Sequence, residues 1–334
     1  MSTVAPPLPD SWSAPEVLLD AVVADGVELR RAGISSIGPI GEEIVGAAVE
    51  AEGSPYERGY FELLERVSTV EFLHGEASSH RLRDLDGGEL EECTTAEIFP
   101  TSVEPTKWRY ARSNGVALHS TWKSAALRAL WELVERDRVL RAWYGETRPQ
   151  RLQCDFGKTP LAHAESYAWR AYLFPAGTTP IVNTLSVVGV FGLPSSDDLP
   201  VVSGYGAQPE RGEALTGAVR EALQQLGFLW GEAVVDTLPD LAPTPLAHLE
   251  RYQWPGNRRA LRKWLEKGHQ RYFVPRDVGL SKAAPCHFVD LTPAWLGEGL
   301  RVVKAVCDDA LPLVFGENPL ANHLPTEIRF HPIG

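Results

Sequence analysis

The stretch Arg128-Ala-Leu-Trp-Glu-Leu-Val-Glu-Arg136 decides how this chain folds, because most of it recurs 70 residues upstream as Arg58-Gly-Tyr-Phe-Glu-Leu-Leu-Glu-Arg66. Five of the nine positions are identical. Both copies lie in segments whose apolar residues recur at helical spacing. The sequence therefore predicts two separate helices that carry the same Glu-x-x-Glu-Arg motif.

The charged residues of each copy are predicted to share one face of their helix. At about 100° per residue they fall within a single arc of about 100°. In the second copy the arc contains Arg128, Glu132, Glu135 and Arg136, and in the first it contains Arg58, Glu62, Glu65 and Arg66. Val139 and Trp143 lie on the glutamate face of the second copy, so its carboxylates are expected in a partly covered site. The core stripe of that helix is predicted to consist of Leu127, Leu130, Trp131 and Val134.

A third, weaker copy occurs at Arg220-Glu-Ala-Leu-Gln-Gln225. Glu221 precedes the amide Gln224, and Gln225 stands where the other copies have arginine. Three helices would then offer oxygen atoms to one cavity, a donor set that suits Mg²⁺ shared with phosphates. Arginines between the carboxylates would bind those phosphates through paired hydrogen bonds. The repeated motif thus predicts a nucleotide and metal site built from helices.

The alternative is that each motif only stabilises its own helix. A glutamate followed four residues later by arginine is an ordinary surface ion pair, worth about 0.2–0.5 kcal/mol. A single copy would favour that interpretation. Two close copies and a degenerate third weigh against it.

Composition describes an ordinary acidic globular protein. The chain has 334 residues, 44% hydrophobic and 23% charged, with a net charge of −12, which argues against nucleic acid or an anionic membrane as a partner. The longest apolar run, around Ile181–Leu193, is shorter than the ~20 residues that span a bilayer. No signal-peptide pattern occurs near the start, so a cytoplasmic location is expected. The four cysteines lack C-x-x-C spacing and are expected to be buried thiols.

Helical and strand-like segments alternate along the chain, which predicts an α/β or mixed α+β fold. The predicted helices are Pro55–Leu73, Ser124–Trp143 and Gly212–Leu229, and the predicted strands include Ile44–Val49, Thr179–Val190 and Leu300–Val306. Residues 1–20 are expected to be a flexible leader and residues 21–334 a single domain. Leu238–Pro245 is expected to be a proline-rich surface loop.

A basic and aromatic segment from Arg251 to Arg276 contains eight Lys or Arg residues. Such a composition can bind RNA, and an acidic peptide could also dock on it. Leu261, Trp264 and Leu265 stand at helical spacing, however. That spacing favours an amphipathic helix whose charges face solvent.

Several blocks of the sequence resemble the YcaO family. The most specific block runs from Ser113-Asn-Gly-Val-Ala117 to Glu132-Leu-Val-Glu-Arg-Asp137. Glu62-Leu-Leu-Glu-Arg66 is similar to an earlier acidic segment of the family, and Glu221-Ala-Leu-Gln224 to a later one. Asp290-Leu-Thr292 followed by Leu300–Lys304 resembles its C-terminal portion.

The resemblance implies a YcaO-like fold in which helices line an ATP and Mg²⁺ site and pack on mixed or antiparallel sheets. It implies metal contacts from five glutamates: Glu62, Glu65, Glu132, Glu135 and Glu221. Nucleotide contacts are expected from Arg58, Arg66, Asn114, Arg128, Arg136, Glu221, Gln224 and Gln225. A homodimer is the assembly that the resemblance suggests.

The activity that the resemblance implies is phosphorylation of a backbone amide oxygen in a ribosomally synthesised precursor peptide, after a nucleophile has added to the carbonyl. Phosphorylation makes the oxygen a good leaving group, while Mg²⁺ and arginines neutralise the transferred charge. The expected product is an azoline formed from Cys, or from Ser or Thr. A macrocyclic amidine or a thioamide would arise from the same activation with a different nucleophile. The alternative from another class is a non-catalytic scaffold with a degenerate nucleotide pocket.

The chain departs from the family pattern in three places. Arg58 stands where members often have a small hydroxyl residue, and no lysine accompanies Glu52-Gly-Ser54. The chain ends Arg329-Phe-His-Pro-Ile-Gly334 rather than in alternating prolines. The segment before residue 26 is too short for the peptide-recognition domain that many members carry. The protein is therefore expected to act alone or with a separate recognition protein.

Overall fold

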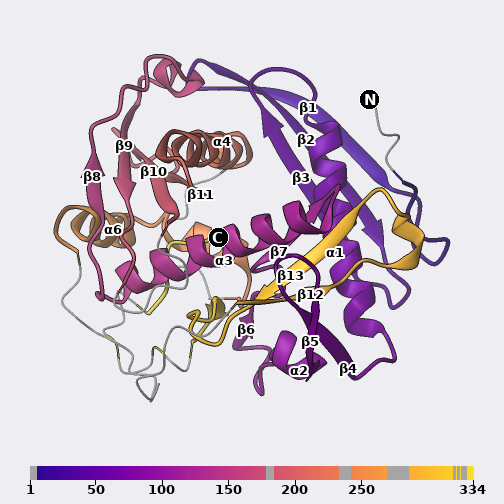
Figure 1. Cartoon of the computed structure of the whole chain (residues 1–334). Helices are drawn as coiled ribbons and strands as arrows, with labels where there is room; N and C mark the ends of the chain where they lie inside the picture. Colours follow the sequence, from indigo (N-terminus) through magenta and orange to yellow (C-terminus); the bar gives the residue numbers. More distant parts are fainter. Residues whose placement is uncertain are drawn as a thin grey trace. The chain divides into compact units, whose positions relative to one another are not determined.

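The structure, a computed structural model, describes residues 6–177, 184–232, 242–268, 286–318, 321, 324 and 329–334 (Figure 1). Its described residues form helices and antiparallel sheets, which confirms the predicted mixed α/β class. The chain divides into two compact units. Unit 1 comprises Met1–Ile98, Gly115–Leu130 and Cys286–Val306, and unit 2 comprises Phe99–Asn114, Trp131–Pro285 and Cys307–Gly334.

Unit 1 begins with a three-stranded antiparallel sheet in the order β1-β2-β3 (Figure 1). The strands are β1 (Glu16–Ala24), β2 (Val27–Ile37) and β3 (Glu43–Glu50). Asp25 and Gly26 join β1 to β2 with positive φ angles of 48° and 85°, the conformation that two-residue hairpin turns require. Because β1 starts at Glu16, the last residues of the predicted leader belong to a strand, while the division into leader and single domain stays a prediction.

Helix α1 (Tyr56–His74) packs on β3 and confirms the predicted helix over Pro55–Leu73. Glycine allows the two backbones to touch. A Cβ atom at Gly46 of β3 would overlap the carbonyl oxygen of Gly59 and the backbone nitrogen of Leu63 in α1. The side chains of α1 can therefore reach the backbone of β3.

The second sheet of unit 1 has five strands in the order β5-β4-β12-β13-β7. They are β4 (Ser79–Arg83), β5 (Glu89–Thr94), β7 (Val116–His119), β12 (His287–Asp290) and β13 (Arg301–Val306), with the short helices α2 (Thr95–Ile98) and η2 (Ala294–Leu296) beside them. Strand β13 confirms the predicted strand over Leu300–Val306. The two central strands thus come from a part of the chain far removed in sequence from their neighbours.

Helix α3 (Trp122–Trp143) confirms the predicted helix over Ser124–Trp143. Of the predicted core stripe, Leu130 and Val134 are buried, whereas Leu127 and Trp131 are only half-buried. The stripe is less distinct than predicted because most side chains from Leu133 to Trp143 are buried, whichever face of the helix they occupy. Val139 and Trp143 are fully buried, as expected for a covered glutamate face.

Unit 2 is built on a four-stranded antiparallel sheet in the order β11-β10-β9-β8. The strands are β8 (Gln150–Leu152), β9 (Tyr167–Leu173), β10 (Ser186–Pro194) and β11 (Val202–Gln208), with η1 (Pro160–His163) before β9. The predicted strand over Thr179–Val190 is confirmed from Ser186 onward, and residues 178–183 lie outside the described residues. A two-stranded sheet pairs β6 (Trp108–Tyr110) with β14 (Val314–Gly316).

Helix α4 (Arg211–Leu229) covers β11 and β10 and confirms the predicted helix over Gly212–Leu229. Glycine again brings helix and strand backbones together, because a Cβ atom at Gly204 or Gly206 would overlap backbone atoms of α4. Tyr205 points to the opposite face of the sheet, where its ring contacts Phe174 and Phe191.

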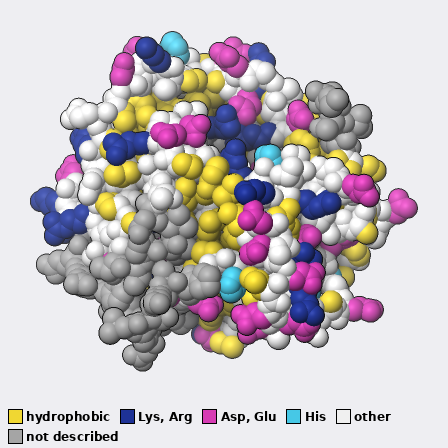
Figure 2. Space-filling model, viewed as in Figure 1, with side chains coloured by type: hydrophobic (Ala, Val, Ile, Leu, Met, Phe, Trp, Pro, Cys, Tyr) yellow, Lys and Arg dark blue, Asp and Glu magenta, His cyan; other side chains and the backbone are white. Residues whose placement is uncertain are grey.

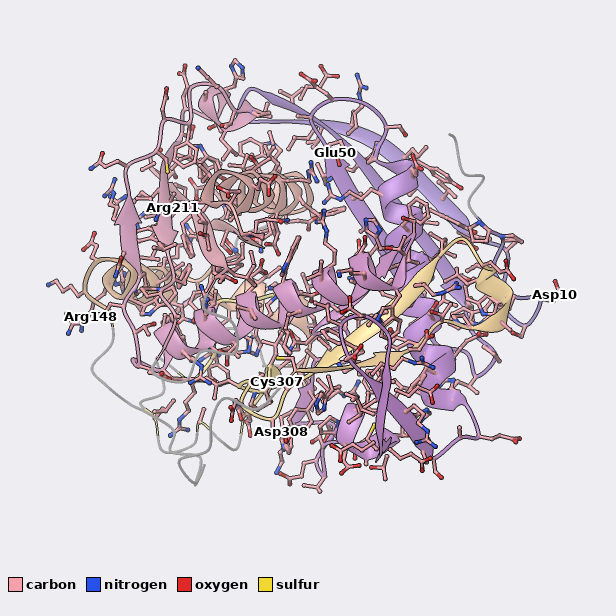
Figure 3. All side chains as sticks on the ribbon, in the orientation of Figure 1. Asp10, Glu50, Arg148, Arg211, Cys307 and Asp308 are labelled. Carbon is pink, nitrogen blue, oxygen red and sulfur yellow. The ribbon has the colours of Figure 1, made fainter. Side chains whose placement is uncertain are left out.

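Helices α5 (Pro245–Arg251) and α6 (Pro255–Lys267) follow α4. Leu261, Trp264 and Leu265 of α6 are buried, whereas most of the basic side chains of α6 are exposed. The predicted amphipathic helix is thus confirmed. Arg148 also projects near α6 at the edge of unit 2 (Figure 3). Residues 238–241 of the predicted proline-rich loop, and residues 269–276 of the basic segment, lie outside the described residues.

Two features of the surface bear on partners. No helix among the described residues is long and apolar enough to cross a membrane. On the face shown in Figure 2, basic and acidic side chains are interspersed where the described residues lie.

The close approach of β11 to α4 predicts a large effect from a single methyl group. Gly204→Ala would drive its Cβ into the α4 backbone, so we expect the free energy of unfolding to fall by about 3 kcal/mol or more. In Gly212→Ala, the added Cβ meets nothing within 4 Å, and a gain of about 0.4–1 kcal/mol is expected. Urea denaturation of both variants checks this, and equal stability would contradict the close contact.

Candidate functional site

The polar residues of α1 form a ladder along β3. The Oε2 atom of Glu62 accepts a hydrogen bond from the backbone N–H of Ala47 at 3.0 Å. One turn later, Nη1 of Arg66 donates to the carbonyl oxygen of Val45 at 2.6 Å. Four helical residues advance about 6 Å and two strand residues about 6.6 Å, so this spacing keeps each side chain level with a backbone group of β3.

Arg58 continues the ladder in the other direction. Its Nη1 atom donates to Oε1 of Glu50 at 2.7 Å and to the carbonyl oxygen of Val49 at 3.4 Å, at the end of β3 where Figure 3 labels Glu50. Both arginines of the first motif thus bind β3. Whether either also binds a phosphate stays a prediction.

Glu65 serves the other sheet of unit 1. Its Oε2 atom accepts a hydrogen bond from the backbone N–H of Leu118 at 2.9 Å. Leu118 belongs to β7, the edge strand of the five-stranded sheet, while β3 is the edge strand of the three-stranded one. The two glutamates of one motif therefore hold the edges of two different sheets.

The third motif repeats this arrangement in unit 2. Glu221 of α4 accepts a hydrogen bond from the backbone N–H of Tyr205, and Oε1 of Gln225 accepts one from the N–H of Ser203 at 2.8 Å. Strand β11 is again an edge strand. The positions of Glu221 and Gln225 correspond to those of Glu62 and Arg66 in α1, and both pairs contact strand residues two positions apart.

The second motif, on α3, places its charges around Arg136, whose side chain is 15% exposed. The Nε atom of Arg136 lies 3.5 Å from Oε1 of Glu135, and its Nη2 atom lies 3.6 Å from Oε1 of Glu221. Burial raises the pKa of Glu135 to about 8; the nearby Arg136 lowers it, while Glu221 and Glu132 raise it further. Three carboxylates thus surround one guanidinium, an excess of negative charge that a cation would relieve.

Arg136 keeps hydrogen-bonding capacity in this position. Burial opposes its charge, yet the carboxylates of Glu221 and Glu135 raise its pKa above the usual value, so it stays protonated. Its buried Nε and Nη1 atoms form no hydrogen bond with any described residue. Buried donors of this kind call for an acceptor, and phosphate oxygens match an arginine well.

The residue that follows the motif has a structural role. Asp137 is buried and accepts hydrogen bonds from Nε of Arg141 at 2.8 Å and from the backbone N–H of Leu311 at 2.8 Å. Arg141 also binds Oε2 of Glu146 at 2.8 Å. This network satisfies the buried charges of the second half of α3 away from Arg136.

Three further predicted site residues lie on other parts of these elements. Asn114 lies in the turn before β7 and is half-buried, Arg128 is exposed on α3, and Gln224 is half-buried on α4. Arg128 contributes to a lowered pKa of His119, which is caused first by burial.

A comparison of the sequence with family profiles identifies the family of the chain. The YcaO family profile, described as YcaO cyclodehydratase, ATP- and Mg²⁺-binding, matches residues 93–308. The chain belongs to the YcaO family. No curated protein matches it in sequence.

Solved YcaO-related structures share its fold at low sequence identity. YcaO from Methanopyrus kandleri bound with AMPPCP and Mg²⁺ has a TM-score of 0.59 and 17% identity, over 88% of this chain and 85% of that one. The E. coli microcin synthetase McbBCD complex with pro-MccB17 bound gives a TM-score of 0.61 and 12% identity, over 100% and 98%. A heterocyclase in complex with substrate and cofactor gives 0.56 and 16%, over 89% of this chain and 49% of that chain.

ATP and Mg²⁺ are the cofactors of the YcaO family, and the residues around Arg136 fit them. No three His, Cys, Asp or Glu side chains in the described part of the chain already form a cage for a metal ion. Mg²⁺ usually needs no such cage, because it takes one or two carboxylates and shares the rest of its shell with phosphates and water. Glu135 and Glu221 could supply such carboxylates, and Arg136 has N–H donors that fit phosphate oxygens.

Sequence reasoning missed two side chains beside this cluster. Tyr205 is buried and its pKa is raised, first by burial and then by Glu221. His331 is buried as well, and burial together with Arg136 helps lower its pKa to about 4. Neither residue belongs to a motif. Only the alternation along β11 could have placed Tyr205 on the face opposite α4.

The hydrogen bond from β11 to Glu221 predicts that alanine and glutamine behave differently at this position. Glu221→Ala leaves the N–H of Tyr205 without its acceptor, so we expect unfolding free energy to fall by about 1–3 kcal/mol. Glu221→Gln keeps an oxygen at this place and should stay within about 1 kcal/mol of the wild type. Both variants remove the same charge, so their difference in urea denaturation isolates the hydrogen bond. Equal losses would contradict its role.

Two buried histidines predict a loss of stability in acid. Nε2 of His248 accepts from the N–H of Gly316 at 3.0 Å, which requires that nitrogen to be unprotonated, and burial, then His331 and Arg251, lower the pKa of His248. With both histidine pKa values lowered on folding, the unfolded chain binds more protons below about pH 6.5. The two histidines should therefore lower the unfolding free energy from there toward pH 4, by up to about 1.4 kcal/mol per pH unit each, while the raised pKa of Glu135 contributes in the opposite direction.

His331→Asn should lower that slope by up to about 1.4 kcal/mol per pH unit, whereas replacing the exposed His163 by glutamine should leave it unchanged. Urea denaturation at a series of pH values measures both slopes. Equal slopes for the wild type and His331→Asn between pH 6.5 and 4 would contradict the prediction.

Proposed function

We propose that this protein is a cytoplasmic enzyme that uses ATP and Mg²⁺ to activate a backbone amide of a ribosomally synthesised precursor peptide. The proposed reaction is cyclodehydration of Cys, or of Ser or Thr, to a thiazoline or oxazoline, with ADP and phosphate as by-products. Family membership supports it, and so does the fold shared with heterocyclases. The observation that carries it is Arg136, whose buried Nε and Nη1 atoms form no hydrogen bond with a described residue while its guanidinium lies between Glu135 and Glu221.

The proposed residue roles combine the family resemblance with the contacts inside each unit. The proposed metal-binding residues are Glu62, Glu65, Glu132, Glu135 and Glu221. The proposed nucleotide-binding residues are Arg58, Arg66, Asn114, Arg128, Arg136, Glu221, Gln224 and Gln225. For the residues of unit 1 the proposal rests on the sequence resemblance.

The chain's own residues would prepare the site before any ligand enters. Within unit 1, backbone N–H groups of β3 and β7 fix one oxygen atom each of Glu62 and Glu65, and within unit 2 the N–H of Tyr205 in β11 fixes one of Glu221, so each carboxylate is already oriented. Arg136 would donate Nε–H and Nη1–H to phosphate oxygens and offset the negative charge there. When bound, Mg·ATP supplies the phosphoryl group that makes the amide oxygen a good leaving group.

The same activation serves other nucleophiles. An amine of the peptide would give a macrocyclic amidine, and sulfide would give a thioamide. The alternative from another class, a scaffold that binds precursor and partner without catalysis, is favoured by one observation: Arg58 and Arg66 are both engaged with β3. A separate peptide-recognition protein is the proposed partner, and one of the structures that share this fold is the E. coli microcin synthetase McbBCD complex.

Calorimetry with Mg·ATP tests the nucleotide site. The wild type should bind, and Arg136→Gln should bind about 10- to 100-fold more weakly, because a charge-assisted hydrogen bond contributes about 1.5–3 kcal/mol. Arg259→Gln on the exposed side of α6 is the matched control and should bind as the wild type does. Absence of binding by the folded wild type would favour the scaffold.

Mass spectrometry separates the three reactions once nucleotide binding is established. Incubation with ATP and a candidate precursor peptide should cause loss of water and of one alkylatable thiol if an azoline forms. Loss of water with every thiol retained would indicate an amidine, and exchange of oxygen for sulfur a thioamide. Unchanged peptide and no ADP, in the presence of a purified recognition partner, would contradict catalysis.

A further inference from the structure

Arg258 of α6 is a buried arginine with two open donor atoms. Its side chain is 3% exposed. Its Nε atom donates a hydrogen bond to the carbonyl oxygen of Gln253 at 2.8 Å, whereas its buried Nη1 and Nη2 atoms form no hydrogen bond with any residue that the structure describes. Buried charged donors are costly to leave without an acceptor. Arg258 is thus prepared for an acceptor at its outer end.

Asp197 stands beside this guanidinium without binding it closely. Its Oδ1 atom lies 3.6 Å from Nη1 of Arg258, and its side chain is 79% exposed. Because a buried group lies so near one that is in solvent, Arg258 ends just below the surface of unit 2. Burial lowers the pKa of Arg258, while Asp197 acts in the opposite direction. A carboxylate at hydrogen-bonding distance would stabilise the charge of Arg258 further.

The loop after β10 that carries Asp197 is fixed at other points. The carbonyl oxygen of Pro194 accepts a hydrogen bond from Nη2 of Arg262 at 3.0 Å, and the backbone N–H of Ser195 donates to the carbonyl oxygen of Ser166 at 2.8 Å. The side chain of Asp197 points into solvent between these anchors and can rotate away from Arg258 while the loop stays in place. An incoming carboxylate can therefore replace it.

The open atoms of Arg258 select a carboxylate. With Nε engaged by Gln253, the two Nη atoms remain, and together they match the two oxygens of one carboxylate through parallel hydrogen bonds. Asp197 and Asp198 both act on this guanidinium electrostatically. They would repel a doubly charged phosphate more strongly than a singly charged carboxylate.

Helix α6 attracts acidic ligands to this place. It contains five basic residues and one acidic residue, in a chain whose net charge is −12. Arg262 follows Arg258 by one helical turn and lies on the same side of α6. A short acidic segment is attracted by this local positive charge, whereas a long polyanion such as RNA would also meet the acidic remainder of the protein.

We propose that Arg258 is a docking site for an acidic peptide segment. A glutamate or aspartate carboxylate of that segment takes the place of Asp197 and forms paired hydrogen bonds with Nη1 and Nη2 of Arg258. Asp197 then serves as an internal competitor that occupies the site weakly when no peptide is bound. The proposal uses none of the residues proposed for nucleotide or metal binding, so it is independent of the proposed reaction.

Fluorescence anisotropy on the full-length chain tests the site. The probe is an eight-residue peptide of alternating glutamate and alanine, blocked at both ends and labelled with a neutral fluorophore. Arg258→Gln should bind this peptide about tenfold more weakly than the wild type, because the charge-assisted pair is lost. Asp197→Asn should bind it about 2- to 5-fold more tightly, because the competing carboxylate is gone.

Arg259→Gln is the matched control, since it removes the same charge from the neighbouring, exposed position. Its affinity for the peptide should stay within about twofold of the wild type. Urea denaturation checks that each variant is folded, and the exposed Asp197 keeps the test decisive even if Arg258→Gln unfolds.

Three results would overturn the proposal. The first is no binding of the peptide by the folded wild type. The second is unchanged or weaker binding by Asp197→Asn, which would make Asp197 only a structural partner of Arg258. The third is an equal loss in Arg258→Gln and Arg259→Gln, or tighter binding of a uridine octanucleotide than of the peptide, which would indicate a general affinity for anions or for RNA. Mg·ATP binding by Asp197→Asn should equal that of the wild type, so the nucleotide site is judged separately.

Discussion

A hydrogen bond between the N–H of an edge strand and a carboxylate on a helix occurs three times in this protein, and the two units depend on it in the same way. It satisfies a backbone donor that a sheet edge would otherwise leave open, and it fixes the orientation of the glutamate. The bond is possible only where the helix lies against the strand backbone. Gly46 on β3, and Gly204 with Gly206 on β11, provide that approach. The glycines let the helix approach the strand, and the glutamates then bind the strand backbone, so the two residue types act together.

This device explains why the acidic motif can serve structure and chemistry together. In Glu62 and in Glu221, one carboxylate oxygen accepts a hydrogen bond from a strand N–H, while the other lies beside an arginine. On α3 the charges of the motif gather around Arg136, whose Nε and Nη1 atoms are buried. Burial there strengthens every electrostatic interaction, which suits the binding of a nucleotide with its cation. It also leaves Glu135 poorly stabilised as an anion when no cation is present.

Much of this was accessible from sequence. The three helices, the covered face of α3 and the amphipathic α6 follow from periodicity, because burial imposes the 3.6-residue repeat directly. The partners of Glu62, Glu65 and Glu221 could not be predicted, since they are backbone groups that become neighbours only through tertiary packing. Tyr205 and His331 escaped notice for a similar reason: each comes near Arg136 from a segment without a recognisable pattern. Leu127 and Trp131 of α3 are only half-buried, because a helix that is buried on several faces has no single apolar stripe that marks its core side.

The topology of unit 1 has a consequence for how the protein is made. In its five-stranded sheet, β4 and β7 are synthesised early, whereas their neighbours β12 and β13 follow only after the long insertion that forms most of unit 2. The meander of β1 to β3 with α1 involves local contacts and can form while the ribosome is still working. The five-stranded sheet cannot form completely until β12 and β13 have been synthesised. Folding of unit 1 should therefore finish late, with β4 and β7 open to chaperones until residues 287–306 emerge.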